Sequence, residues 1–304
     1  MAGLLLACGP ALAVPMPEQA PAVEAALGTE AQGGGGADSK VVSQTLLPPD
    51  VAKAESQPKL TLVNGKAYLV MDADTGKVLI SYHGMDRRAP ASLTKVMTAL
   101  LVLERGRMEQ VVTIDKDVER LRDTDSTMLW VEPGDTMTVR DLLYGMMLMS
   151  GNDAALVLAK HLAGSEANFV ELMNKRAAEL GLKDTRFSNA HGLDSRNHYS
   201  SAHDLARLSS YAMKNQAFRQ LSAAQKADIV ISGDVYPIRN YNSLLTAYQG
   251  TDGIKIGFTD AAGQTIAASA TRDGRRLIAI VLGSDRRFND AINLLDLGFG
   301  LRTS

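Results

Sequence analysis

Ser92 and Lys95 have the residue types and the spacing needed for nucleophilic catalysis. They lie three residues apart where an apolar helix is predicted to begin, so their side chains share one face and can touch. A serine hydroxyl is a weak nucleophile unless a base lies within hydrogen-bonding distance, and a lysine serves as that base only where burial or a second cation lowers its pKa. The pair alone is weak evidence, because a helix-capping serine followed by a solvated lysine has the same spacing.

A second polar group, Ser150-Gly151-Asn152, follows 58 residues after Ser92, at a glycine break between two apolar helical runs. Such a break exposes side chains. Ser150 can pass a proton toward a leaving amine, and Asn152 can hydrogen-bond a substrate amide. The alternative is a plain turn in which Asn152 caps the next helix.

The third group, Lys255-Ile256-Gly257, lies in a β-prone run. Its lysine would supply a second cation, and its glycine would let a substrate backbone lie close against the strand. In this order and spacing, the three groups resemble the Ser-x-x-Lys, Ser-x-Asn and Lys-Thr-Gly motifs of penicillin-binding proteins and β-lactamases. Their combination is much stronger evidence than any one of them.

The elements around these groups alternate between strand and helix patterns. Two β-prone runs near residue 70 are separated by Ala73-Asp74-Thr75-Gly76, which predicts a hairpin, and Asp273-Gly274 predicts another. Two capping boxes, Thr138 with Asp141 and Ser201 with Asp204, predict helix starts. We expect an α/β fold with one antiparallel sheet flanked by helices and an inserted helical subdomain. The predicted strands are 67–72, 77–82, 253–259, 264–271 and 276–283, and the predicted helices are 92–104, 139–148, 152–163, 165–180, 202–214 and 287–297.

Composition limits the class of function. The 304 residues carry 32 Lys and Arg against 34 Asp and Glu, so no basic field favours a nucleic-acid partner. The single cysteine, Cys8, excludes an internal disulfide and a cysteine-based metal cluster. The five histidines lack zinc-binding spacing, so we interpret them as packing or surface residues and expect no metal or other cofactor.

The N-terminal part predicts export to the periplasm. Residues 1–13 are apolar and end in Ala11-Leu12-Ala13, which is typical of a signal peptide. The positively charged region with which signal peptides begin is missing, since no Lys or Arg precedes Lys40; a misassigned start codon would explain this. A lipoprotein signal with acylated Cys8 is the alternative. The run is too short to span a bilayer, so no transmembrane anchor is expected. Residues 14–57 are rich in Pro, Ala and Gly and predict a flexible linker, followed by one domain over 58–304.

From about Leu60 to its end, the chain resembles the D-alanyl-D-alanine carboxypeptidase and endopeptidase family, the low-molecular-mass penicillin-binding proteins. Within that family it is most similar to the D-alanyl-D-alanine endopeptidase type, penicillin-binding protein 7, because only 47 residues follow Gly257 and leave no room for a C-terminal β-domain and anchor. Carboxypeptidase activity is the alternative. Besides the three motifs, the resemblance rests on residues 72–76, 90–98, 142–155, 187–193 and 198–205.

The resemblance implies a β-lactamase/transpeptidase-like fold, peptidoglycan muropeptides as substrates and β-lactam antibiotics as covalent inhibitors. It implies that Ser92 forms the acyl-ester, that Lys95 is the general base, that Ser150 relays a proton and that Asn152 orients the substrate amide. Lys255, Ile256 and Gly257 would bind substrate, and the backbone amides of Ser92 and Phe258 would form the oxyanion hole.

One residue departs from the family pattern, since Ile256 stands where the third motif has threonine. The missing hydroxyl would help to hold a substrate carboxylate. Strand alternation puts residues 256 and 258 on one face and 259 on the other, so Thr259 is not expected to replace it.

Two other functions compete with a serine DD-peptidase. A class A β-lactamase needs a deacylating glutamate in a Glu-x-x-Leu-Asn stretch, and the nearest candidates, Glu166 and Glu171, lack the Leu-Asn pair. A weakly catalytic muropeptide-binding protein is the rival from another class.

Overall fold

The computed structural model describes residues 58–124 and 126–301. The predicted signal peptide over 1–13 and the predicted linker over 14–57 lie outside these residues. None of the described helices has the length and apolar character needed to cross a membrane.

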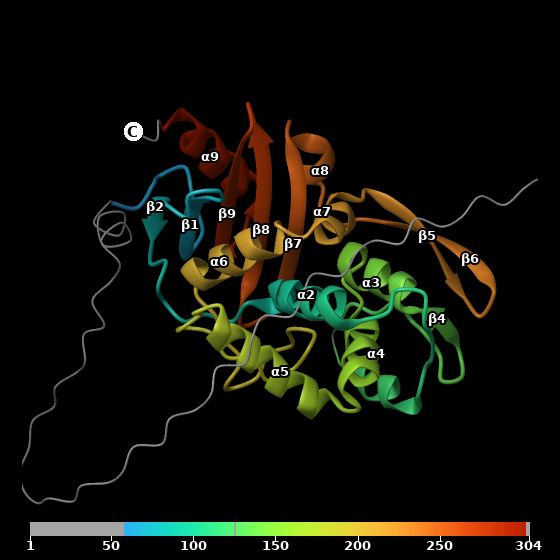
Figure 1. The fold of residues 1–304 in the computed structure, drawn as a ribbon. Coiled ribbons are helices and arrows are strands. Elements are labelled where there is room, and N and C mark those ends of the chain that lie inside the picture. Colours follow the sequence, from blue (N-terminus) through green and yellow to red (C-terminus); the bar gives the residue numbers. More distant parts are fainter. Residues whose placement is uncertain (1–57, 125, 302–304) are drawn as a thin grey trace, which may run out of the picture. The chain divides into compact units, whose positions relative to one another are not determined.

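A five-stranded sheet forms the centre of the domain (Figure 1). Its order is β2-β1-β9-β8-β7, and every neighbouring pair is antiparallel. The bounds are β1 Ala67–Asp72, β2 Val78–Tyr82, β7 Thr251–Thr259, β8 Gly263–Arg272 and β9 Arg275–Ser284. The two predicted hairpins are confirmed, and β7, which carries the third motif, is an edge strand. One side of β7 is therefore free to face a substrate.

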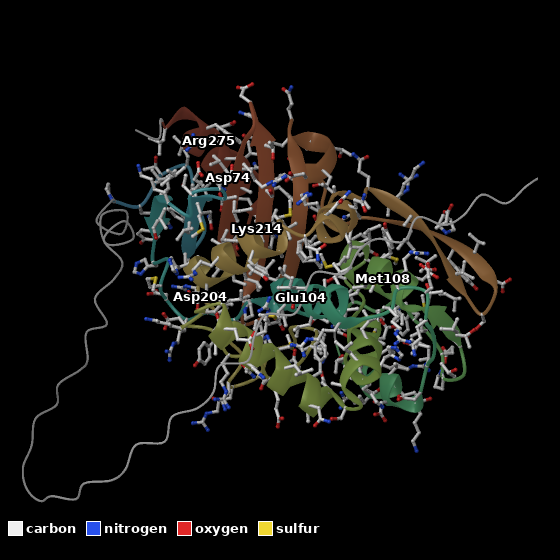
Figure 2. All side chains as sticks on the ribbon, viewed as in Figure 1. Asp74, Glu104, Met108, Asp204, Lys214 and Arg275 are labelled. Carbon is white, nitrogen blue, oxygen red and sulfur yellow. The ribbon has the colours of Figure 1, made fainter. Side chains whose placement is uncertain are left out.

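Helices cover both faces of the sheet, which explains why the middle residues of the inner strands β1, β8 and β9 are buried. Alternate residues of β1 point to opposite sides: Leu69 belongs to the core with α2 (Lys95–Arg105) and α6 (Ala202–Ala212), and Val70 to the core with α9 (Arg287–Gly300). Figure 2 shows side chains filling these layers, and Arg275, labelled there, pairs with Asp72 at 2.8 Å across the end of the sheet.

The inserted helical subdomain is confirmed. It lies between β2 and β7 in the chain and contains most of the helices. Its elements are η1 Ala91–Thr94, α2, β3 Val111–Thr113, η2 Lys116–Leu121, β4 Thr136–Thr138, α3 Val139–Leu148, α4 Asn152–Ala163, α5 Glu166–Glu179, α6, α7 Gln216–Ala223, β5 Lys226–Ile231, β6 Asp234–Arg239 and α8 Leu244–Ala247.

The capping boxes begin the helices as predicted. The side chain of Thr138 accepts a hydrogen bond from the Asp141 amide ahead of α3, and that of Ser201 accepts one from the Asp204 amide ahead of α6. These bonds satisfy amide groups that have no partner inside the helix.

The first predicted helix is wrong in its opening turn. Residues 91–94 form a 3₁₀ turn, and the α-helix begins only at Lys95. Ala91, which directly precedes the predicted helix, opens this turn with a left-handed φ of 50°. This turn carries Ser92.

Candidate active site

The 3₁₀ turn brings Ser92 and Lys95 together. Residues three apart in such a turn are nearly eclipsed, so the two side chains project in the same direction. Lys95 Nζ lies 2.9 Å from Ser92 Oγ. Ser92 is partly exposed and lines a cleft of about 660 Å³, whereas Lys95 is completely buried beneath it. A hydroxyl open to substrate thus has an amine behind it.

Lys95 is held by three acceptors. Besides Ser92 Oγ, its Nζ donates to Asn152 Oδ1 at 2.6 Å and to the His191 carbonyl oxygen at 2.6 Å. Burial, and secondarily the positive charge of Lys255, lowers the pKa of Lys95 well below its ordinary value. A neutral amine is therefore accessible in this site, and a neutral amine can accept the Ser92 proton.

Lys255 and Arg287 supply cations at the other side of the site. Lys255 is buried, and burial followed by the charge of Arg287 lowers its pKa to about 7. Arg287 extends from the start of α9, lines the cleft and donates from Nη1 to the Gly257 carbonyl at 2.5 Å. Arg287 was not among the site residues predicted from the sequence. A signal existed, because a cation at a helix N-terminus is electrostatically unfavourable and needs another reason to be there.

Ser150 and Asn152 come from the break between α3 and α4. Ser150 has a left-handed φ of 66°, lines the cleft, and its hydroxyl has no hydrogen-bond partner among the described residues. Asn152 is the first residue of α4, and its side chain makes no capping bond; Gly151 occupies the N-cap position. The alternative interpretation of Asn152 as a helix cap is therefore wrong, and its amide oxygen points to Lys95 instead.

Gly257 contacts the turn that carries Ser92. A Cβ added to Gly257 would lie 2.6 Å from Thr265 Oγ1, 2.8 Å from the Ser92 backbone nitrogen and 3.0 Å from Ala91 Cβ. The glycine is thus required by the close approach of β7 to this turn. The predicted reason for this glycine was the close approach of a substrate backbone, whereas in the structure the backbone of the Ser92 turn lies against it.

The neighbours of Gly257 line the cleft. Ile256 is half-buried and packs against the core on the α9 side of the sheet, while Phe258 is 58% exposed. Thr259 also lines the cleft, but its hydroxyl donates to Asp194 Oδ1 at 2.8 Å. Because this hydroxyl proton is already donated to Asp194, Thr259 does not replace the hydroxyl that Ile256 lacks as a donor to a substrate carboxylate.

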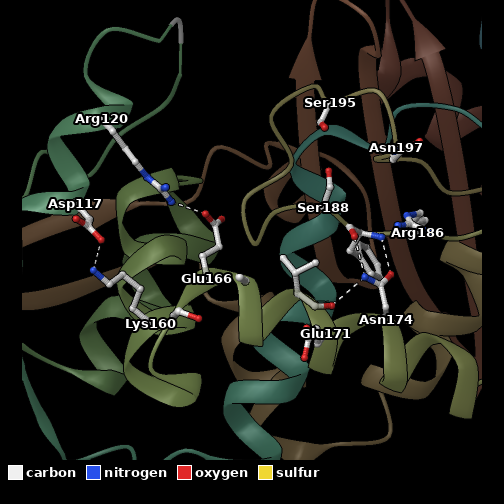
Figure 3. Close-up of a pocket in the computed structure, with 14 residues that line it drawn as sticks. Asp117, Arg120, Lys160, Glu166, Glu171, Asn174, Arg186, Ser188, Ser195 and Asn197 are labelled. Atoms are coloured by element: carbon white, nitrogen blue, oxygen red, sulfur yellow. Dashed lines mark hydrogen bonds and ion pairs between the residues drawn. The ribbon is translucent and has the colours of Figure 1, made fainter.

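A separate cavity of about 710 Å³ lies on the far side of the 188–193 segment (Figure 3). Glu166 and Glu171, the nearest candidates for a deacylating glutamate, line this cavity and do not line the Ser92 cleft. Neither carboxylate faces the position of an acyl-enzyme, which argues against the β-lactamase alternative.

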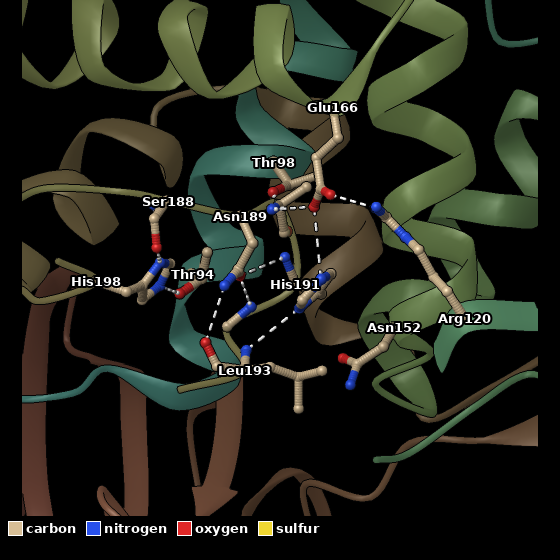
Figure 4. A network of polar contacts seen from close by, with 12 residues as sticks. Thr94, Thr98, Arg120, Asn152, Glu166, Ser188, Asn189, His191, Leu193 and His198 are labelled. Atoms are coloured by element: carbon tan, nitrogen blue, oxygen red, sulfur yellow. Dashed lines mark hydrogen bonds and ion pairs between the residues drawn. The ribbon is translucent and has the colours of Figure 1, made fainter. Parts of the chain in front are cut away.

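Two histidines belong to the polar network under the site (Figure 4). His198 Nε2 lies 2.7 Å from Thr94 Oγ1, in the turn that carries Ser92, and burial lowers the pKa of His198 to about 4. Burial, then Lys95, lowers the pKa of His191 well below its ordinary value. Both are packed as expected, and both also hydrogen-bond segments that frame the site.

An antiparallel sheet covered by helices, with a serine-lysine pair between sheet and helical subdomain, defines a serine peptidase of the β-lactamase/transpeptidase-like fold. The family described as Peptidase_S11, D-alanyl-D-alanine carboxypeptidase, matches residues 51–286, and the chain belongs to this family.

Relatives of known sequence and structure agree with this assignment. The chain is 35% identical over 262 residues to the D-alanyl-D-alanine carboxypeptidase DacF of Bacillus subtilis, covering 84% of this chain and 67% of the relative. It is 35% identical over 265 residues to DacC of Escherichia coli, covering 84% and 66%. The chain thus spans about two thirds of these relatives. The crystal structure of the Streptomyces K15 DD-transpeptidase superposes with a TM-score of 0.75 at 32% identity, over 81% of this chain and all of that one.

Proposed function

We propose that the chain is a serine DD-peptidase that cleaves peptidoglycan stem peptides after D-alanine through an acyl-enzyme. The observation that carries the proposal is the buried Lys95 amine, 2.9 Å from the hydroxyl of the partly exposed Ser92. Two of the relatives above are named D-alanyl-D-alanine carboxypeptidases, which supports the same class of substrate.

In the proposed reaction, Ser92 Oγ attacks the carbonyl carbon of the D-alanyl residue, and Lys95 accepts the Ser92 proton. The backbone amides of Ser92 and Phe258 stabilise the developing oxyanion. The bond to the leaving amine then breaks, and Ser150 delivers a proton to that amine while it takes the former Ser92 proton from Lys95, which becomes neutral again. Water attacks the acyl-ester, releases the peptide and restores the Ser92 hydroxyl.

Asn152 is proposed to orient the stem-peptide amide while its oxygen also holds Lys95. Arg287 is proposed to attract the carboxylate of the leaving group, because it lines the cleft. Lys255 is buried close enough to feel the charge of Arg287 and is proposed to add positive charge to the same region. Ile256 and Gly257 form the wall against which this group lies. β-Lactams, which carry a comparable carboxylate, would acylate Ser92.

The finer proposal is endopeptidase action on the D-alanyl-diaminopimelyl crosslink in the periplasm, with removal of a terminal D-alanine as the alternative. In both cases the leaving group carries a carboxylate next to the amine that departs, so the two cations serve either substrate. The endopeptidase proposal rests on the resemblance of the sequence to the endopeptidase type within the family.

Mass spectrometry of muropeptides after incubation with the protein tests both the general DD-peptidase proposal and the finer endopeptidase proposal. Conversion of crosslinked dimers to monomers supports endopeptidase action, and loss of one alanine supports carboxypeptidase action. A Ser92→Ala variant is the matched control. Penicillin labelling without any muropeptide cleavage would favour the muropeptide-binding rival, and absence of both would refute the DD-peptidase proposal.

A further inference from the structure

Lys95 depends on a segment that has no regular secondary structure. Two of its acceptors come from η1 and α4, but the third is the carbonyl of His191, within residues 188–193, which belong to neither helix nor strand. A carbonyl in such a segment is not fixed by a helix or strand ladder. Its position relative to Lys95 Nζ must be set by other contacts.

Glu166 contacts this segment from behind, together with Thr98, which donates to the Ala190 carbonyl at 2.6 Å, and within the segment Asn189 accepts from the Gly192 amide at 2.7 Å. Glu166 Oε1 accepts a hydrogen bond from the Ala190 backbone amide at 3.1 Å and lies 3.4 Å from His191 Nε2 (Figure 4). Ala190 is fully buried and the His191 side chain nearly so. The buried Ala190 amide would lose its hydrogen-bond partner, at a desolvation cost, if this oxygen were removed, and His191 Nε2 would lose its nearest carboxylate.

The hydrogen bonds also fix the state of the His191 ring. Its Nδ1 accepts from the Leu193 backbone amide at 3.2 Å, so the proton of the neutral ring is on Nε2, which faces Glu166. The low pKa of His191 agrees with a neutral ring. The N–H of the neutral ring therefore faces Glu166 Oε1, 3.4 Å away.

The carboxylate has a second, more exposed partner. Glu166 Oε2 pairs with Arg120, whose side chain is 53% exposed, while the Glu166 side chain is 17% exposed. Figure 3 shows the same pair at the wall of the cavity, whose lining residues do not include Ser92. Oε1 of Glu166 therefore contacts the segment next to the active site, and Oε2 pairs with a side chain at the surface.

We propose that Glu166 is a positioning residue for the general base, because its Oε1 holds the Ala190–His191 segment so that the His191 carbonyl faces Lys95 Nζ. Glu166 does not touch substrate and acts only through this segment. The inference rests on the proposed function, since it concerns how fast Ser92 is acylated.

The test compares two substitutions of similar size. Glu166→Gln keeps an acceptor oxygen for Ala190 and His191, and its amide can face Arg120, which is free to turn toward solvent. Glu166→Met fills the same space without an acceptor. Arg120→Ala is the matched control, because it removes the ion pair and leaves the contacts of Glu166 Oε1 with Ala190 and His191 in place.

Acylation by a fluorescent penicillin is measured as two constants, the dissociation constant of the non-covalent complex and the first-order acylation constant. Active-site titration normalises each value, so a partly folded variant still gives a result. We expect the acylation constant of Glu166→Met to fall at least about tenfold, with the dissociation constant little changed. Glu166→Gln and Arg120→Ala should stay within about threefold of the unmodified protein.

Three results would overturn the inference: a Glu166→Met acylation constant within about twofold of the unmodified protein, a Glu166→Gln variant as slow as Glu166→Met, or an equal loss in Arg120→Ala. The first would mean that the segment keeps its position without Glu166. The others would mean that charge, and not the acceptor oxygen, matters. An unmodified protein that is not labelled at all would refute the proposed function instead.

Discussion

Replacing Gly257 by alanine should separate β7 from the turn that carries Ser92. The added Cβ would lie 2.8 Å from the Ser92 backbone nitrogen, 0.6 Å less than the 3.4 Å at which ordinary contact begins. Thr265 Oγ1 can rotate away, but a backbone nitrogen cannot, so strand and turn must move apart by about half an ångström. The φ of Gly257 is not left-handed, so the effect comes from this contact and not from backbone conformation.

We expect Gly257→Ala to cost about 1–3 kcal/mol of stability through overpacking. Acylation should fall about 10- to 100-fold, because the backbone amides of Ser92 and Phe258 would no longer converge on one oxyanion. Second-order acylation by a fluorescent penicillin and the thermal midpoint are measured together. Gly300→Ala, at the open end of α9 with no atom within 4 Å of the added Cβ, is the control and should behave like the unmodified protein. Unchanged acylation in Gly257→Ala would show that catalysis does not require the close approach of β7 to the Ser92 turn.

Three further substitutions or conditions test the proposed chemistry. Lys95→Arg should lower acylation at least about a hundredfold, because guanidinium cannot act as a base, and an active arginine variant would contradict the base assignment. Ile256→Thr should raise acylation about 10- to 100-fold, since a hydrogen bond to a carboxylate contributes about 1.5–3 kcal/mol; a slower variant with a lower thermal midpoint would show that Ile256 serves only packing. Lys255, whose pKa is about 7, is charged below that pH and neutral above it, so acylation should decline as pH rises from about 7 to about 9, and Lys255→Arg should lack the decline. A pH series on both proteins checks this, and an identical alkaline limb in the arginine variant would count against it.

Much of the fold follows from local sequence patterns. The β1–β2 and β8–β9 hairpins and the helices begun by Thr138 and Ser201 are confirmed, because turn and capping residues act within a few positions of the chain. The hairpin of β5 and β6 was missed. Nearly all of β6 is exposed, so it lacks the alternation of buried and exposed residues that indicates a strand.

The site was only partly predictable, because its geometry depends on contacts between distant segments. The spacing of Ser92 and Lys95 predicted that they can touch, and the structure brings them together. The contact of Gly257 with Ser92, the place of Arg287 in the cleft and the bond from Ala190 to Glu166 each join residues far apart in the chain. No periodicity or capping rule reports such contacts.

The central claim is that Ser92 is the acyl-accepting nucleophile. Intact-mass measurement after exposure to benzylpenicillin, followed by peptide mapping of the adduct, tests it most directly. We predict one penicilloyl group per molecule on the peptide that contains Ser92, and none on a Ser92→Ala variant with an unchanged thermal midpoint. An adduct on another residue, or undiminished labelling of the alanine variant, would contradict the claim.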